Sequence, residues 1–250
     1  PRADVHLKID SGMNRLGIQP KQARQFAKQL KKIKKLNVTG IYSHLSQSAD
    51  LNKEFTHNQI QTFKQVIKVF EQEGYKFRWK HISATSGAKI VNDKEFNLIR
   101  LGLGFYGVSP FLKNSSQTAE FNNNLKPALK LLSHLAAIKS VPAGAEVGYG
   151  GTYVAKHKTK LGILPLGYYE GVDRRLSNKG VVSINNTPCP IVGRVCMNLT
   201  IIDLTRVDNA KIGDPVVVYS NQTNQPNSIA HLAEQADTIP YVLLVNLAES

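Results

Sequence analysis

The chain contains few cysteines, and it lacks any long hydrophobic run. Its two cysteines, Cys189 and Cys196, are too few for a disulfide framework, and they lack metal-ligand spacing with the seven histidines. No run approaches the roughly 18 apolar residues of a membrane-spanning helix, and residues 1–10 have neither the basic start nor the apolar centre of a signal peptide. These absences predict a cytoplasmic protein with reduced cysteines, no bound metal and no membrane contact.

Acidic residues are also scarce, with 18 Asp and Glu against 32 Lys and Arg, giving a net charge of +14. Such an excess raises the question of a nucleic-acid partner. Much of it lies in one segment whose apolar residues recur at helical spacing, and no aromatic or glycine pattern of a nucleic-acid module accompanies it. We therefore interpret the segment as the solvated face of an amphipathic helix and expect no nucleic-acid partner. Its basic residues are Lys21, Arg24, Lys28, Lys31, Lys32, Lys34 and Lys35.

The first part of the chain alternates strand and helix patterns with short connections, which predicts βα units with a parallel sheet. Four such units are half of a (β/α)8 barrel, and half a barrel leaves two sheet edges and an apolar interior uncovered. We therefore expect the natural chain to continue upstream by about 120 residues. The expected strands span 5–9, 38–42, 77–82 and 98–101, and the expected helices start at Pro20, run from 55 to 74 and cover 88–92. Lys8, His44, Thr85 and Arg100 fall at or near strand ends, which form the catalytic face of such a barrel.

After about residue 124 the segments become short and rich in Val, Ile and Leu, and turn signals separate them, which predicts a β domain. The expected strands lie at 129–141, 160–166, 181–184, 191–195, 200–204 and 215–219. The predicted architecture is thus α/β plus all-β: the second half of a TIM-type barrel over residues 1–121 and a C-terminal β domain over residues 122–250. A polar, asparagine-rich stretch at 115–124 is the expected linker.

Tyr149 is flanked by glycines, in the stretch Glu-Val-Gly-Tyr-Gly-Gly-Thr-Tyr at 146–153. Glycine lacks a Cβ atom that would crowd a ligand, and it tolerates backbone angles that other residues resist. This stretch can therefore present a phenol at a loop tip, where it can act as an acid or a base. Local evidence alone also fits a glycine-rich hairpin turn with an exposed tyrosine.

Several motifs in order resemble those of the alanine racemase family, across essentially all 250 residues. Each motif is weak alone, but together they imply a homodimeric pyridoxal-phosphate enzyme with shared active sites and a small amino-acid substrate. The resemblance implies interconversion of L- and D-alanine by two bases, which supplies D-alanine for peptidoglycan. The motifs are Lys-Ile-Asp-Ser-Gly-Met-Asn-Arg-Leu-Gly at 8–17, Tyr-Ser-His at 42–44, Ile-Arg-Leu-Gly at 99–102, Tyr-Gly at 106–107, Val-Gly-Tyr-Gly at 147–150, Gly-Tyr at 167–168, Asp-Arg-Arg at 173–175 and Gly-Arg-Val-Cys-Met at 193–197.

The resemblance implies a role for each catalytic candidate. Arg100 is expected to donate a hydrogen bond to the pyridine nitrogen of the cofactor, and because a guanidinium cannot accept a proton, it keeps that nitrogen unprotonated and limits side reactions. The local alternative for Arg100 is a structural salt bridge. Tyr149 is expected to be a catalytic base that acts in the active site of the other subunit. His44 is expected in a network with Arg100 and Tyr149, rather than as a metal ligand.

Other residues are expected to bind the cofactor phosphate and the substrate. The family pattern places Thr85, Gly102, Leu103 and Tyr241 at the phosphate, with Ser86 as an alternative to Thr85 and a core role as an alternative for Tyr241. Arg15 and the backbone N–H of Met197 are expected at the substrate carboxylate. Lys8 is either a carbamylated lysine that braces Arg15 or an unmodified barrel lysine. The entrance residues are expected to be Tyr168, Arg174 and Arg194.

Two departures from the family pattern stand out. Asn198 stands where relatives commonly have aspartate. No lysine in the chain lies in the family's cofactor motif, so we expect the Schiff-base lysine upstream and this chain alone to be inactive. The alternatives are a racemase of other or broad specificity, such as serine, and a non-catalytic ligand- or nucleic-acid-binding relative. A decarboxylase of the same architecture is disfavoured, because decarboxylation benefits from a protonated pyridine and Arg100 opposes it.

Overall fold

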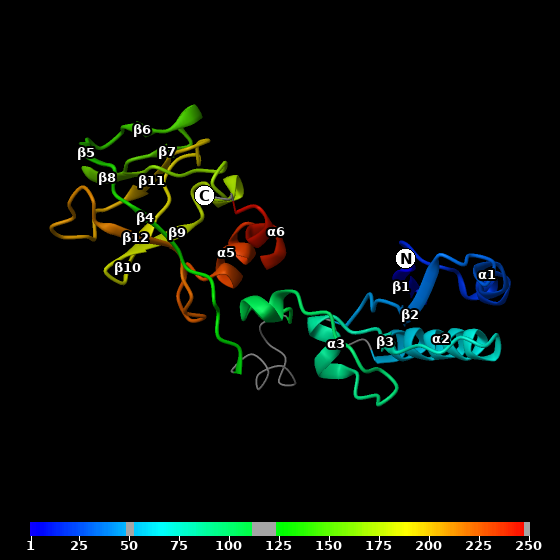
Figure 1. Ribbon diagram of the computed structural model, residues 1–250. Helices are drawn as coiled ribbons and strands as arrows, with labels where there is room; N and C mark the ends of the chain where they lie inside the picture. The colour runs from blue at the N-terminus through cyan, green and yellow to red at the C-terminus, as the bar shows by residue number, and fades with distance from the viewer. Residues whose placement is uncertain (49–52, 112–123, 248–250) are drawn as a thin grey trace. The chain divides into compact units, whose positions relative to one another are not determined.

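The computed structural model describes residues 1–48, 53–111 and 124–247, which fall into two compact units (Figure 1). Unit 1 comprises Pro1–Phe105 with Ser109–Asn122, and unit 2 comprises Tyr106–Val108 with Asn123–Ser250. The expected boundary between residues 121 and 122, like most of the expected linker at 115–124, lies outside the described residues. In the described ranges no helix is both long enough and apolar enough to cross a membrane.

Unit 1 is built on a parallel sheet in the order β1-β2-β3, as the βα pattern predicted. The register places Lys8 beside Tyr42, and Tyr42 beside His81, so the last residues of the three strands form a row. The strands are β1 (Ala3–Lys8), β2 (Leu36–Tyr42) and β3 (Trp79–His81), and the helical segments are η1 (Pro20–Gln22), α1 (Ala23–Leu30), α2 (Lys53–Gln72), α3 (Thr85–Ile90) and η2 (Leu103–Tyr106).

One face of this sheet is apolar and packs on the helices, because side chains alternate between the two faces of a strand. Leu7 and Ile41 from the strands join Ala27, Phe63 and Phe70 from α1 and α2 in one buried core. His6, Lys8, Tyr42 and His81 occupy alternate positions, and their side chains contact one another. The core of unit 1 therefore lies between sheet and helices and leaves the polar face available for a site.

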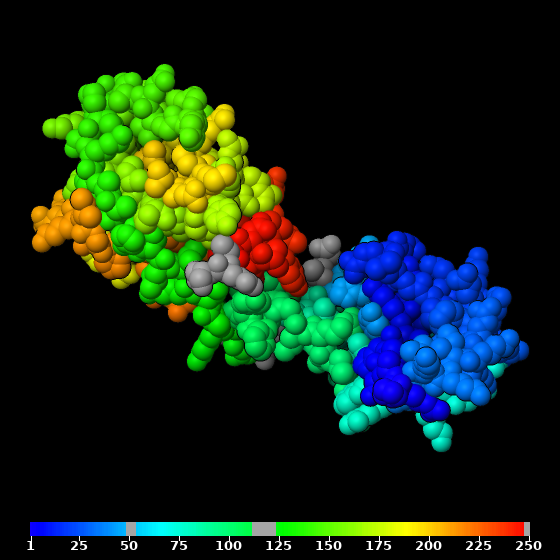
Figure 2. Space-filling view, turned by 45° about the horizontal axis from the view of Figure 1, so that its top comes forward, coloured from blue at the N-terminus to red at the C-terminus, as the bar shows by residue number. Residues whose placement is uncertain are grey.

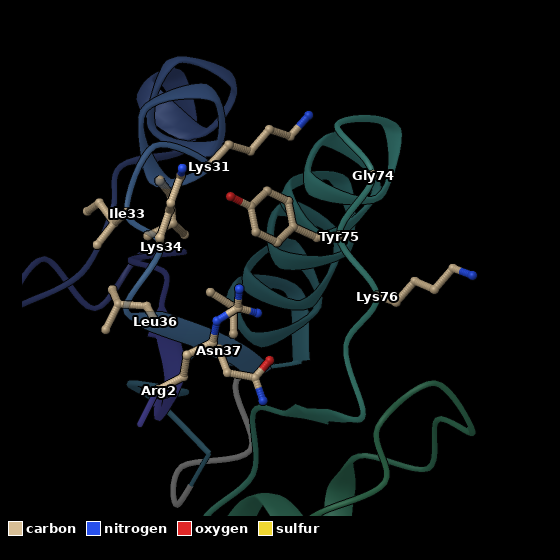
Figure 3. A pocket seen from close by; sticks show the side chains of 11 residues that line it. Arg2, Lys31, Ile33, Lys34, Leu36, Asn37, Gly74, Tyr75 and Lys76 are labelled. Atoms are coloured by element: carbon tan, nitrogen blue, oxygen red, sulfur yellow. The ribbon is translucent and has the colours of Figure 1, made fainter.

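The basic helix α1 borders a groove of about 320 Å³ on unit 1 (Figure 3). Arg2, Lys31, Lys34 and Lys76 all line it, together with Tyr75. In Figure 3 the side chains of Lys31 and Lys76 point away from the Tyr75 ring. The Tyr75 hydroxyl donates to the backbone carbonyl of Ala27 at 3.0 Å, so it connects the segment that follows α2 to α1.

Unit 2 contains two antiparallel sheets and a hairpin. One sheet has the order β10-β9-β12-β4, the other has the order β11-β8-β5, and β6 pairs with β7. The elements are β4 (Leu131–His134), β5 (Ala137–Val141), β6 (Glu146–Val147), η3 (Tyr149–Gly151), β7 (Tyr153–Val154), β8 (Thr159–Leu164), η4 (Arg174–Leu176), β9 (Val181–Ile184), β10 (Thr187–Pro190), β11 (Thr200–Asp203) and β12 (Pro215–Tyr219), followed by the helices α5 (Ile229–Gln235) and α6 (Pro240–Val245).

Three local expectations were wrong. Residues 98–101 form no strand. The segment expected as a strand at 191–195 contains only an isolated bridge at Ile191, and the strand β10 lies just before it. The β domain also carries two short helices that the sequence did not predict.

Helix α6 ends close to Gly171, where an added Cβ atom would lie 2.9 Å from the carbonyl oxygen of Asn246. In Figure 2 the red residues of this helix adjoin yellow-green residues of unit 2.

Candidate active site

Arg100 is the centre of the hydrogen-bond network of unit 1. Its Nη2 donates to the carbonyl oxygens of Ser43 at 2.9 Å and Ile82 at 3.2 Å, and it lies 3.0 Å from Nδ1 of His44. Its Nη1 lies 2.5 Å from Nδ1 of His81. Among the described residues, the partners of the guanidinium all come from β3 or from the loops that follow β2 and β3. No acidic side chain contacts Arg100 within the described ranges, which argues against the structural salt bridge considered for it.

The contact with Arg100 fixes the tautomer of His81. A guanidinium can only donate, so Nδ1 of His81 must accept, and the ring proton of a neutral His81 must lie on Nε2. That Nε2 lies 2.8 Å from Nδ1 of His6, which accordingly accepts. Burial, then the charge of Arg100 and the proximity of His6, lower the pKa of His81 to about 4. His81 is therefore a neutral link between Arg100 and His6 at pH 7.

Glycine at position 40 makes this link sterically feasible. A Cβ atom on Gly40 would lie 2.7 Å from three atoms of the His6 ring. The His6 side chain thus crosses β2 where that strand has no side chain, and it reaches His81 on the next strand. The Tyr42 ring stacks on His81 with ring centroids 5.0 Å apart and lies 5.2 Å from the Arg100 guanidinium carbon, so it covers the network from one side.

His44 lies among positive charges. Its pKa is lowered by burial first and then by the nearby charges of Arg100, Arg15 and Lys8. Arg15 belongs to an exposed loop that folds around the Asp10 carboxylate, which accepts the backbone N–H groups of Gly12 and Asn14. The sequence analysis placed Lys8, Arg15, His44 and Arg100 at one site, and the structure brings these four side chains near one another in unit 1.

The Thr85 side chain forms a buried anchor next to this network. Its hydroxyl oxygen accepts the backbone N–H groups of Gly102 at 3.1 Å and Gly104 at 3.2 Å. Thr85 is 1% exposed, and an added Cβ atom on Gly104 would lie 2.7 Å from its methyl group. Ser86, the alternative to Thr85, instead pairs with Ser48 at 2.6 Å between hydroxyl oxygens. Thr85 thus holds the loop of residues 102–104 through two of its backbone N–H groups.

In unit 2, Tyr149 lies at the tip of a glycine-built turn and is 71% exposed. Gly148 and Gly150 have φ values of 75° and 72°, in the left-handed region that favours glycine. A Cβ atom on Gly150 would lie 3.9 Å from the guanidinium carbon of Arg194, so the Arg194 side chain runs beside the turn. Asn178 connects this turn to the segment of Arg194. Its amide nitrogen donates to the carbonyl of Thr152, and its amide oxygen accepts the N–H of Gly193.

A second cluster in unit 2 surrounds Met197. Gly167 lies so close to the backbone of residues 196–197 that any side chain there would collide with it. The N–H of Tyr169 donates to the carbonyl of Met197 at 3.0 Å. Glu170 accepts from the Gly167 N–H at 2.7 Å and from the Asn198 amide at 2.6 Å.

The remaining expected residues of unit 2 are exposed side chains. Tyr168 lies next to this cluster, Arg174 begins η4, and Tyr241 lies in the first turn of α6. Cys189 and Cys196 are free, and no group of three or more metal-ligating side chains occurs in residues 1–48, 53–111 and 124–247.

Comparison with known proteins decides the family. The family model of the alanine racemase N-terminal domain matches residues 1–110, and that of the alanine racemase C-terminal domain matches residues 128–250. The chain belongs to the alanine racemase family. The alanine racemase of Halothermothrix orenii is 35% identical over 247 residues, which cover 98% of this chain and 63% of that protein.

Solved alanine racemases share the fold. The enzyme of Bacillus anthracis with bound L-Ala-P superposes with a TM-score of 0.88 at 28% identity, covering 99% of this chain and 63% of that one. The enzyme of Bartonella henselae with covalently bound pyridoxal phosphate gives a TM-score of 0.82 at 27% identity, covering 98% of this chain and 64% of that one. The chain thus spans less than two thirds of these alanine racemases. The predicted fold class, a half barrel followed by a β domain, is confirmed.

Sequence reasoning missed two residues of the network in this alanine racemase family member, His6 and His81. The available signal was position, because His81 ends a strand in the row that also contains Lys8 and Tyr42. His6 gave no signal, since it lies two residues before a strand end and reaches the network only because residue 40 is glycine.

Proposed function

We propose that the chain is part of a pyridoxal-phosphate-dependent racemase that interconverts L- and D-alanine. The observation that carries this proposal is the environment of Arg100, whose guanidinium contacts only neutral acceptors among the residues that the structure describes. A guanidinium in this setting remains a hydrogen-bond donor at neutral pH and offers no proton acceptor. This property suits the ring nitrogen of pyridoxal phosphate in a racemase, where the nitrogen has to stay unprotonated.

The proposal places the phosphate of this cofactor at the loop that Thr85 holds. The loop that Thr85 gathers brings the N–H groups of Gly102 and Gly104 to one hydroxyl, and Leu103 lies between them. We assign the phosphate to Thr85, Gly102, Leu103 and Tyr241. When bound, pyridoxal phosphate withdraws electrons from the substrate Cα and makes its proton acidic.

Side chains of the same chain suit binding of the amino acid and transfer of its proton. Arg15 and the N–H of Met197 bind the substrate carboxylate, and Tyr149 accepts or returns the Cα proton on one face of the substrate. Inversion at Cα requires a proton removed from one face and returned to the other, so a second base is needed, and we assign it to a lysine outside these 250 residues. His44, in contact with Arg100, belongs to the network that positions these groups.

The proposal extends to the assembly and its setting. Tyr149 acts in the site of the partner subunit of a homodimer, and Tyr168, Arg174 and Arg194 form the entrance. Lys8 is a candidate for carbamylation, because a carbamate would provide an anion for Arg15. The enzyme is cytoplasmic and supplies D-alanine for peptidoglycan. The chain of 250 residues alone is inactive, because the cofactor lysine lies outside it.

A racemisation assay tests the proposal. The natural gene product that contains this chain is incubated with pyridoxal phosphate and either L-alanine or D-alanine, and the appearance of the other enantiomer is followed by chiral chromatography. We expect conversion in both directions, slower conversion of serine, and none by residues 1–250 alone. A folded, cofactor-loaded gene product that converts neither alanine would favour the non-catalytic alternative, and faster serine conversion would reassign the substrate.

A further inference from the structure

Gln59 is a buried polar side chain that the proposed mechanism does not use. It lies on α2, is 2% exposed, and points to the loop that follows β2. Its Oε1 accepts the N–H of Ser46 at 3.0 Å and the Ser46 hydroxyl at 3.2 Å, and its Nε2 donates to the carbonyl of His44 at 3.3 Å. Both ends of one amide thus hold the backbone on either side of Leu45.

The same amide also contacts the loop that follows β1. A Cβ atom on Gly12 would lie 3.2 Å from Cγ and 3.3 Å from Nε2 of Gln59. Gly12 has a φ of 135° and belongs to the loop that Asp10 folds and that carries Arg15. Gln59 therefore lies beneath two loops at once, one bearing His44 and the other bearing Arg15.

We propose that Gln59 is a positioning residue that fixes His44 relative to Arg15 and Arg100. This inference rests on the proposed function, in which these three side chains belong to one site. A second contact supports the role of the loops as a unit, because the hydroxyls of Ser11 and Ser43 lie 2.7 Å apart and Ser43 donates to the carbonyl of Ile9. Ser43 holds the loops at the strand ends, and Gln59 holds them further out.

The titration of His44 reports this arrangement without any assay of activity. His44 has a pKa below the ordinary 6.5 because it is buried and because Arg100, Arg15 and Lys8 lie near it. Gln59→Met keeps the length of the side chain but removes all three hydrogen bonds. If the loops then separate, the His44 pKa should rise toward 6.5. The experiment is an NMR titration of the imidazole protons of the natural gene product, labelled at histidine, with a His44→Gln variant to assign the signal.

Two further variants keep the test decisive. Gln59→Asn retains an amide but is one methylene too short to reach both partners, so it should raise the His44 pKa as Gln59→Met does, and it replaces that variant if the latter does not fold. Val66→Ala removes core volume two turns further along α2, and it should leave the His44 pKa unchanged. Loss of racemase activity from the gene product would not alter these titrations, so the two proposals fail separately. An unchanged His44 pKa in the folded Gln59 variants, or an equal rise in Val66→Ala, would overturn the inference.

Discussion

The Nδ1 atom of His6 lies 2.8 Å from Nε2 of His81, across a strand that separates the two residues in the sheet. Because Arg100 can only donate to His81, the proton between the two imidazoles belongs to His81. The order of donors is therefore Arg100 to His81 to His6. This order keeps His81 neutral and gives the guanidinium an acceptor that adds no negative charge.

Gly40→Ala should break this link. The new Cβ atom would lie 2.7 Å from the His6 ring, so the ring must move away, and overpacking of this kind costs about 1–3 kcal/mol of stability. Gly40 has no positive φ, so alanine adds no backbone strain. Urea denaturation of the variant and of the parent chain measures the difference in the free energy of unfolding.

A double-mutant cycle identifies the cause. In a His6→Ala background the ring is absent, so Gly40→Ala should cost less than about 0.5 kcal/mol, and the coupling energy should account for most of the single-variant effect. Equal costs of Gly40→Ala in both backgrounds would show that the His6 ring does not occupy the space above Gly40.

The low pKa of His81 predicts a pH dependence of stability. The unfolded chain binds a proton near the ordinary pKa of 6.5, whereas the folded chain binds it only near pH 4. Between these values the unfolded state binds more protons, so stability falls as the pH falls from about 6.5 to about 4, by up to about 1.4 kcal/mol per pH unit for one full proton. Well above pH 6.5 both states are neutral at His81, and the effect vanishes.

The comparison uses His81→Gln, which has no titrating group but retains an acceptor for Arg100 and a donor for His6. Urea denaturation from about pH 4.5 to about pH 7.5 should show a shallower loss of stability in acid for this variant than for the parent chain. His44 titrates in both proteins, so the difference isolates His81. Parallel pH profiles would contradict the pKa of about 4.

The fold was largely predictable from sequence, and the reasons are local. Alternation at Val5, Leu7 and Ile9 identified β1, and apolar residues at helical spacing identified α2. The strand predicted at 98–101 does not form, and two of its three apolar residues, Ile99 and Leu101, are exposed and do not pack in a sheet. The strand predicted at 191–195 does not form, because this apolar segment follows β10 without continuing its hydrogen bonds to β9.

Some residues of the site were likewise predictable from the sequence, and others were not. Arg100 and His44 were predicted as site residues from motifs, and Thr85 from its position after an expected strand. His6 and Gln59 act through contacts between residues far apart in the sequence, and each depends on a neighbouring glycine whose significance appears only in three dimensions. No pattern within a single segment carries that information.

Asn198→Asp should destabilise the segment around Glu170. The Asn198 amide donates to Glu170 at 2.6 Å, and an aspartate at pH 7 would place two carboxylates in contact without a donor between them. Burial tends to raise the pKa of Glu170, but hydrogen bonds from Gly167 and Asn198 outweigh it and lower the pKa. The substitution should therefore raise the Glu170 pKa and lower the melting temperature at pH 7, with a smaller loss near pH 4, where a proton can be shared.

Thermal melts at the two pH values provide the measurement, and a second substitution provides the control. Adding Glu170→Gln to Asn198→Asp restores one donor and one acceptor with their positions exchanged, so the double variant should recover most of the lost melting temperature. A single variant as stable as the parent chain at pH 7 would show that the Asn198 amide does not hold this segment.

Tyr149→Phe should greatly slow racemisation by the natural gene product without affecting its folding. The side chain is 71% exposed, so loss of the hydroxyl should change the free energy of unfolding by less than about 0.5 kcal/mol. Loss of a general acid or base should lower the rate by about 10²- to 10⁴-fold. Because the proposal gives the opposite face to a lysine, deuterium exchange at Cα of D-alanine should persist while exchange from L-alanine is lost.

Tyr169→Phe is the matched control, because Tyr169 is 68% exposed and contributes its backbone N–H, not its hydroxyl, to the Met197 segment. This variant should racemise alanine at the parent rate, since the bond to the Met197 carbonyl survives the substitution. Exchange in deuterated water, followed separately from each enantiomer, distinguishes a lost base from a site that no longer binds substrate, because a binding defect would slow both directions alike. If Tyr149→Phe retains full racemisation, or if Tyr169→Phe loses as much, the phenol of Tyr149 is not the base.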